Sequence, residues 1–241
     1  MNAKVYVLDY GTNLTDVSVL LAGKGMGQVI KIPVFGVFID HPHAKIVVDT
    51  GVNNVNAPGP ANWKHQHSET QTTVEQLKLH GVDASAIDYV ISTHLHYDHA
   101  GNMHVFPRAK VIVRREELEK AYVPIEPGDI TYNREDFDRA LNYVLVPNGL
   151  DFELVDGVRV LSTPGHTAGS QSVLVETSDG NVLYAGDAVY MYENWEKNVL
   201  PGICYSAEKQ WESIAKLKTL RNLVLLPGHE PKLNLTKHYG V

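Results

Sequence analysis

Residues 93 to 102 carry the sequence Thr93-His94-Leu95-His96-Tyr97-Asp98-His99-Ala100-Gly101-Asn102. The apolar run at residues 89–91 precedes it, which indicates that the histidines begin at the end of a strand. Side chains two residues apart in extended backbone point the same way, so His94 and His96 can bind one metal ion together. Asp98 and His99 follow where the chain turns and can face a second ion. One H-x-H pair is common, but the complete H-x-H-x-D-H pattern predicts a metal site rather than a histidine-rich surface turn.

Three later segments repeat one arrangement, in which an apolar run leads to a glycine and then to one possible ligand: Gly165-His166, Gly186-Asp187 and Gly228-His229. Glycine lets the backbone turn sharply and approach other groups closely. Strand ends are where sites assemble in α/β folds, because the loops converge there. A lone histidine after glycine is more often a turn residue. Four strand ends that carry seven ligand-type side chains form a coherent set.

Seven ligands exceed the four or so that one zinc ion takes, whereas two ions that share a carboxylate fit the number. We assign His94, His96 and His166 to the first ion and Asp98, His99 and His229 to the second, with Asp187 as the bridge. Each ion then keeps room for a shared water or hydroxide, which is typical of a catalytic site. Two divalent ions are therefore expected, zinc by default, with cobalt, manganese or iron also suited to these ligands.

The composition limits the other classes of function. The 241 residues are 44% hydrophobic with a net charge of −7, which is typical of a globular protein. Basic runs are no longer than Arg114-Arg115, which argues against a nucleic-acid partner, and no window is apolar enough to span a membrane. Cys204 is the single cysteine, so neither an internal disulfide nor a thiolate zinc cage is expected. We expect one cytoplasmic domain over residues 1–241, as a monomer or homodimer.

Short apolar runs closed by turn residues predict strands at 4–8, 32–39, 45–48, 89–92, 110–113, 158–161, 172–175, 182–184 and 223–226. Helices are predicted at 72–80, at 115–122 and after an N-cap at Ser206. The mixture indicates an α/β layered architecture. Residues 11–28 and 51–69 are predicted to be long loops, which often surround a binding site.

The metal segment and the later Gly-His, Gly-Asp and Gly-His pairs resemble the metallo-β-lactamase superfamily in type and order, from about Ile32 to His229. This resemblance implies a four-layered αβ/βα sandwich, with a dinuclear site at one edge of two packed sheets. It also implies the same assignment of metal ligands.

Within that superfamily the chain looks most like the quorum-quenching N-acyl-homoserine lactone lactonases. This likeness rests on three features of the sequence. They are the opening strands with Asp49-Thr50-Gly51, the metal segment, and Asp187 followed three residues later by Tyr190. In that family the tyrosine points at the substrate carbonyl, so the resemblance implies this role for Tyr190. Two departures are Gly186 before the aspartate and the single Gly101 before Asn102, where many lactonases have two glycines.

The resemblance predicts hydrolysis of a small lactone substrate by a hydroxide that bridges the metals. Tyr190 and one metal would stabilise the oxyanion, and Asp98 would ligate a metal or pass a proton to the leaving group. Asp49 is expected to hydrogen-bond near the ligands.

Alternatives stay open on the same scaffold. They are a thioesterase of the glyoxalase II kind or another ester hydrolase, a mono-iron dioxygenase, and a metal-binding scaffold without catalysis. Glyoxalase II enzymes usually carry a helical C-terminal extension, and only 12 residues follow His229.

Overall fold

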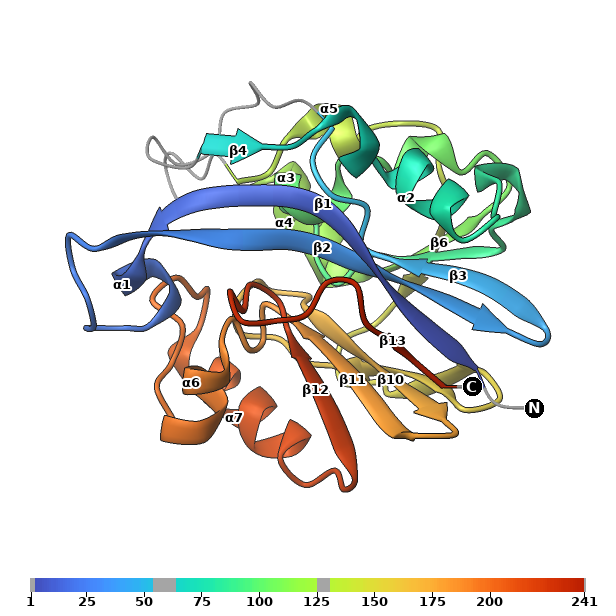
Figure 1. Ribbon diagram of the computed structural model, residues 1–241. Helices are drawn as coiled ribbons and strands as arrows, with labels where there is room; N and C mark the ends of the chain where they lie inside the picture. Colours follow the sequence, from blue (N-terminus) through green and yellow to red (C-terminus); the bar gives the residue numbers. More distant parts are fainter. Residues whose placement is uncertain (1–2, 54–63, 125–130, 241) are drawn as a thin grey trace.

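The computed structural model describes residues 3–53, 64–124 and 131–240, whose strands form two sheets (Figure 1). The eight-stranded sheet contains β1 Lys4–Asp16, β2 Val29–His41, β3 Ala44–Val48, β4 Lys64–Gln66, β5 Tyr89–Ile91, β6 Lys110–Arg114, β7 Asn142–Val146 and β13 His238–Tyr239. The five-stranded sheet contains β8 Phe152–Val155, β9 Val158–Ser162, β10 Gln171–Thr177, β11 Gly180–Gly186 and β12 Leu223–Pro227.

The larger sheet runs in the order β13-β1-β2-β3-β5-β6-β7, with β4 paired to β1. The smaller sheet runs β12-β11-β10-β9-β8. Neighbouring strands from β3 through β5 and β6 to β7 are parallel, as are β11 and β12, and the other pairs are antiparallel. The helices are α1 Val17–Leu20, α2 Thr73–Leu79, α3 Tyr97–Ala100, α4 Arg115–Tyr122, α5 Arg134–Phe137, α6 Tyr192–Lys197 and α7 Ala207–Leu217.

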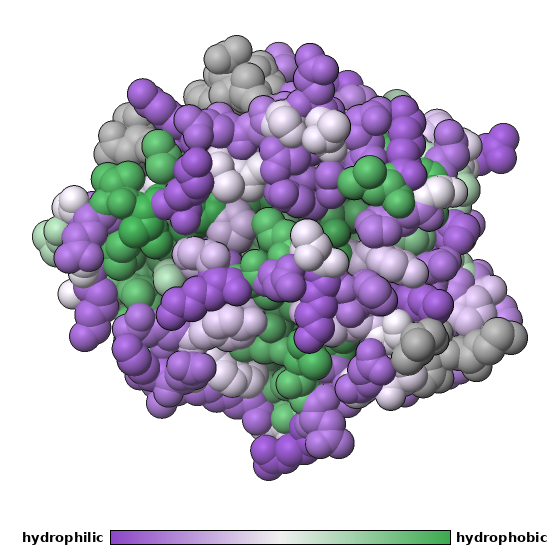
Figure 2. All heavy atoms as spheres, viewed as in Figure 1, coloured by the Kyte–Doolittle hydropathy of each residue, from purple (hydrophilic) through white to green (hydrophobic). Residues whose placement is uncertain are grey.

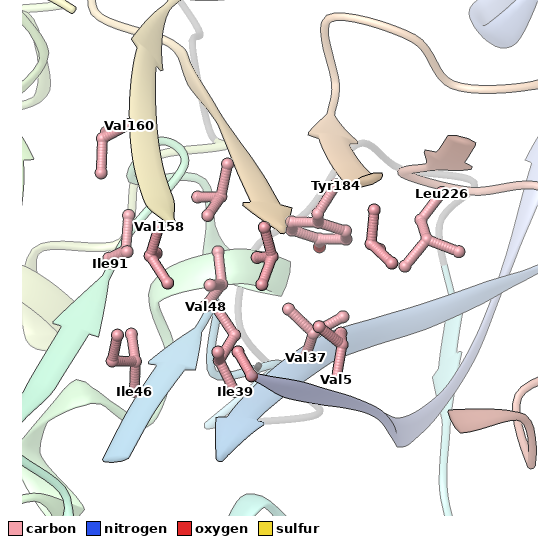
Figure 3. Close-up of a cluster of buried hydrophobic side chains, with 14 of the residues drawn as sticks. Val5, Val37, Ile39, Ile46, Val48, Ile91, Val158, Val160, Tyr184 and Leu226 are labelled. Carbon is pink, nitrogen blue, oxygen red and sulfur yellow. The ribbon is translucent and has the colours of Figure 1, made fainter. Parts of the chain in front are cut away.

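The two sheets pack face to face through a shared apolar core (Figure 3). Val37, Ile39 and Val48 of the larger sheet meet Val160 and Tyr184 of the smaller one. These side chains alternate with outward-facing ones along each strand, as the two-residue period of a strand requires.

Each sheet also carries apolar side chains on its outer face, and helices cover them. α2, α3, α4 and α5 pack on the larger sheet, where Leu77 and Phe137 join its second core. α6 and α7 lie against the smaller sheet, where Ile214 and Leu217 join a third core (Figure 1). The result is a four-layered αβ/βα sandwich, and this prediction is confirmed. None of the helices in the described ranges combines the length and apolar character needed to cross a bilayer.

The predicted helices form where their capping residues stand. The Thr72 hydroxyl accepts a hydrogen bond from the Glu75 amide at the start of α2, and Ser206 does the same for Lys209 in α7. Both predicted helix starts are confirmed.

The predicted long loop at residues 11–28 is partly wrong. β1 continues past a bulge between Asp9 and Thr12 and pairs with β2 as far as Asp16. Its polar residues Asn13 and Thr15 are fully buried, so this part of the strand lacks the apolar pattern that marks a strand in a sequence. The segment between β1 and β2 leaves Met26 80% exposed. This segment lies at the left end of the molecule in Figure 1, where Figure 2 shows apolar side chains at the surface. Of the other predicted loop, residues 54–63 lie outside the described residues, and Lys64–Gln66 form β4.

Candidate metal centre

The carboxyl ends of β5, β9, β11 and β12 deliver the seven predicted ligands to one place. His94 follows β5, and His96 precedes α3, which contains Asp98 and His99. Since β11 and β12 are parallel neighbours, Asp187 and His229 leave the sheet side by side. Gly228 allows this approach, because a Cβ atom there would stand 2.6 Å from the Asp187 Oδ1 atom.

Three overlapping groups of these side chains offer ligand atoms within 4.8 Å of one another. We call His94, His96 and His166 the first ligand group, and Asp98, His99 and His229 the second ligand group. The third group joins His94, His99 and Asp187. All seven predicted residues are thus brought together within the described part of the chain.

Asp187 stands between the two ligand groups, with one carboxylate oxygen towards each. Its Oδ2 atom lies 3.3 Å from His166 Nε2 and 3.8 Å from His94 Nε2. Its Oδ1 atom lies 3.3 Å from His99 Nε2 and 3.4 Å from His229 Nε2. This two-sided contact is the geometry that a bridging carboxylate requires.

The inward-facing atoms fit a cation better than they fit one another. The Nε2 atoms of His94, His99 and His229 and the Oδ1 atom of Asp187 are buried and have no hydrogen-bond partner. Leaving buried polar atoms unpaired costs about 1–3 kcal/mol each, which a bound cation would offset. In two of these histidines the other ring nitrogen, Nδ1, has a hydrogen-bond partner. His99 Nδ1 lies 2.8 Å from Asp49 Oδ2, and His229 Nδ1 lies 2.8 Å from the Pro33 carbonyl. Such contacts orient imidazole ligands in metal sites.

Burial sets the protonation of the first ligand group. It lowers the pKa values of His94, His96 and His166, so these imidazoles are neutral and can offer a lone pair at neutral pH. Burial alone would raise the pKa of Asp187, but the surrounding histidines, His99 foremost, outweigh it and hold that pKa well below its usual value.

The second ligand group is held differently. Burial alone would lower the pKa values of His99 and His229, but nearby carboxylates, Asp187 foremost, outweigh it and raise both. A cation that binds there must displace these protons, so its affinity for this group falls as the pH falls.

The model of the metallo-β-lactamase superfamily matches residues 31–229, which include all seven residues of the site. The chain belongs to this superfamily. The resemblance to this superfamily predicted from the sequence is therefore confirmed.

Several characterised members are similar over nearly the whole chain. An N-acyl homoserine lactonase from a Bacillus species is 35% identical, with 89% of this chain and 87% of that protein covered. The lactonase AttM of Rhizobium radiobacter is 30% identical, with 95% and 93% covered. A solved N-acyl homoserine lactone hydrolase, with N-hexanoyl-L-homoserine bound at its catalytic metal centre, has a TM-score of 0.86 and 30% identity, covering 96% of this chain and 95% of that one.

Asp49 connects the metal segment to the rest of this superfamily fold. Its fully buried carboxylate accepts hydrogen bonds from the Thr93 amide and hydroxyl, both at 2.7 Å, and from the Tyr184 hydroxyl at 3.0 Å. It also contacts His99, as the sequence predicted. Asp49 adopts a φ of 59°, a strained value that aspartate tolerates better than most residues.

Tyr190 lies at the inner wall of the centre. Its hydroxyl is 3.2 Å from His166 Nδ1, and its ring centroid is 5.4 Å from that of His229. Leu20, Leu21 and Ile32 pack around it. Burial raises the pKa of Tyr190 well above its usual value, so the hydroxyl keeps its proton. If His166 uses Nε2 as a ligand, Nδ1 carries the hydrogen, and the hydroxyl proton of Tyr190 can then point elsewhere.

Asn13 is a buried polar residue at the centre that was not predicted from the sequence. Asn13 of β1 donates from Nδ2 to Asp98 Oδ2 at 3.3 Å and to the Tyr97 hydroxyl at 3.1 Å. Its Oδ1 atom lies 2.9 Å from His65 Nδ1. Asn13 occurs in a stretch without apolar periodicity, so the sequence contains no local signal for this role.

Proposed function

We propose that this protein hydrolyses the ring ester of N-acyl-homoserine lactones, with two divalent metal ions held by the seven residues of the centre. The observation that carries the proposal is the two-sided contact of Asp187 with both ligand groups. The identity of 30–35% to lactonases over most of the chain supports the choice of substrate.

Two divalent ions bound there would make a bound water more acidic and would polarise the lactone carbonyl. Imidazole and carboxylate ligands suit zinc first, and also cobalt, manganese and iron. The only cysteine in the sequence is not among the seven ligands, so zinc would be held by imidazole and carboxylate groups alone. Because one cysteine cannot form an internal disulfide, the sequence also fits the cytoplasmic location that we propose. We propose one domain, as a monomer or a homodimer.

The residues of the chain have separate tasks in this reaction. Tyr190 donates its hydroxyl proton as a hydrogen bond to the carbonyl oxygen, where negative charge develops as water adds. Asp98, oriented by Asn13, takes the proton that the attacking water loses and passes it to the ring oxygen as the C–O bond breaks. The product is the open-chain hydroxy acid.

A hydrolysis panel on the metal-loaded protein tests the function. It contains homoserine lactones of several chain lengths, thioesters, phosphodiesters and a cephalosporin. We expect a clear preference for lactones that chelation removes and added metal restores. Preference for thioesters would replace the proposal with a thioesterase of the glyoxalase II kind. Turnover only with iron and oxygen would replace it with a dioxygenase.

Replacing Tyr190 with phenylalanine is expected to lower kcat about 10- to 100-fold, because one donor to the developing oxyanion is lost. Metal content is expected to stay the same, since His166 Nδ1 still lies 3.2 Å from the Ile203 carbonyl. Tyr192→Phe is the control, because the Tyr192 hydroxyl contacts the Leu225 carbonyl instead. An unchanged kcat in Tyr190→Phe would remove Tyr190 from the mechanism.

A further inference from the structure

A buried carboxylate lies behind the first ligand group. Glu117 of α4 is fully buried, and its Oε1 atom accepts the Leu95 amide at 2.9 Å and the Tyr132 hydroxyl at 3.2 Å. Its Oε2 atom accepts the Gly169 amide at 3.0 Å. A carboxylate with this many donors is held in one orientation.

The hydrogen bonds of Glu117 reach each segment that supplies the first ligand group. Leu95 stands between His94 and His96 in the chain, and Gly169 follows His166 by three residues. Tyr132 forms a β-bridge with His96, and their ring centroids are 4.8 Å apart. One carboxylate thus connects the segments of His94, His96 and His166.

The second ligand group takes its orientation from other residues. Asp49 holds His99, the Pro33 carbonyl holds His229, and Asn13 holds Asp98. Asp49 also reaches the first group, because the Thr93 hydroxyl that it accepts lies 3.1 Å from His94 Nδ1. The hydrogen bonds of Glu117, in contrast, go to the segments of the first group, and Asp187 stands between the two groups.

Close packing fixes the distance between α4 and the segment of His166. A Cβ atom on Gly169 would stand 2.5 Å from the Cβ atom of Glu117, which real side chains do not tolerate. Gly169 thus lets the backbone come near enough for its amide to reach the carboxylate.

We propose that Glu117 is a positioning residue that sets the metal affinity of the first ligand group independently of the second. This inference rests on the proposed dinuclear site. The reason is geometric: the hydroxyl of Tyr132 can rotate to meet a new partner, but the amides of Leu95 and Gly169 cannot. In Glu117→Gln the new NH₂ group must face one of these two amides, and the segment with that amide shifts.

The test titrates metal-free protein with Co²⁺ and Zn²⁺, following the Co²⁺ absorption spectrum and the heat of binding. We expect the wild type to bind two equivalents. Glu117→Gln should bind one of them as the wild type does and the other about 10- to 100-fold more weakly, as for loss of an outer contact to a metal ligand. Anomalous diffraction from crystals with one equivalent of Zn²⁺ should place the remaining ion among Asp98, His99 and His229.

Two further variants complete the test. Glu153→Gln is the control, because its carboxylate accepts the Gly157 amide in the turn between β8 and β9, and both affinities should stay unchanged. Tyr132→Phe removes one donor and keeps the ring beside His96. It should weaken the binding of the same ion by about 2- to 10-fold, and it serves as the test if Glu117→Gln fails to fold.

Two results would overturn the inference: equal affinities in Glu117→Gln and the wild type, or an equal loss at both ions. A wild type that binds neither ion would instead refute the proposed function. The failures of the two proposals are therefore distinguishable.

Discussion

Replacing Asp187 with alanine is expected to remove the binding of both metal ions and to lower lactone hydrolysis by a factor on the order of 10³ or more. Asp187 contacts both ligand groups, with Oδ2 3.3 Å from His166 Nε2 and Oδ1 3.3 Å from His99 Nε2. In the proposed dinuclear site its loss would take one ligand from each ion and would also remove the negative charge between them. Elemental analysis and the rate of lactone opening measure the two effects.

Asp187→Asn removes the negative charge of this side chain and keeps its shape, so it separates the two contributions to metal binding. The amide keeps one oxygen as a ligand, so we expect one ion to remain bound weakly and activity to fall less far. Asp83→Ala is the matched control, since Asp83 is exposed and its carboxylate accepts hydrogen bonds from the amide and hydroxyl of Ser85 instead. Full metal content in Asp187→Ala would show that this carboxylate is not the bridge.

Asp49→Asn is expected to destabilise the metal-free protein by about 2 to 4 kcal/mol, which lowers Tm by roughly 4 to 16 °C. Oδ1 of Asp49 accepts the Thr93 amide, while Oδ2 faces the Thr93 hydroxyl, the Tyr184 hydroxyl and His99 Nδ1. Asparagine has only one oxygen, so at least one of these buried donors loses its acceptor in either amide orientation. Urea unfolding of chelated protein measures the loss.

The backbone at residue 49 does not confound this comparison. Its φ of 59° lies in the left-handed region, which asparagine tolerates at least as well as aspartate. Asp156→Asn, at an exposed position in the turn between β8 and β9, should change the unfolding free energy by less than about 0.5 kcal/mol. An Asp49→Asn protein as stable as the wild type would mean that the network around Thr93 contributes little to the fold.

The metal ligands were predictable because the residues next to each of them in the sequence form a recognisable pattern. His94 to His99 form one dense pattern, and His166, Asp187 and His229 each follow a glycine at the end of an apolar strand. Strand ends in a layered α/β fold converge, so residues that follow different strands can be expected to lie close together in space. The resemblance supplied the remaining step, from converging ligands to a sandwich of two sheets.

The supports of the ligands were not predictable in the same way. Asn13 reaches Asp98 across 85 positions of the chain, and its strand carries polar residues on the buried side. Glu117 reads as one of several acidic residues at the start of an ordinary helix, yet it is fully buried. β7 and β8 were missed as well, although β7 contains the apolar run Tyr143-Val144-Leu145-Val146; most of the side chains of both strands are only partly buried or exposed. Contacts between distant segments leave no local pattern for such residues.

The most direct test of the dinuclear site is the metal content of protein purified without chelators and then resupplied with zinc, cobalt, manganese or iron. Elemental analysis is expected to find two ions per chain, and lactone hydrolysis should rise with the content up to that number. Undiminished lactone hydrolysis by protein that holds no metal would contradict the account.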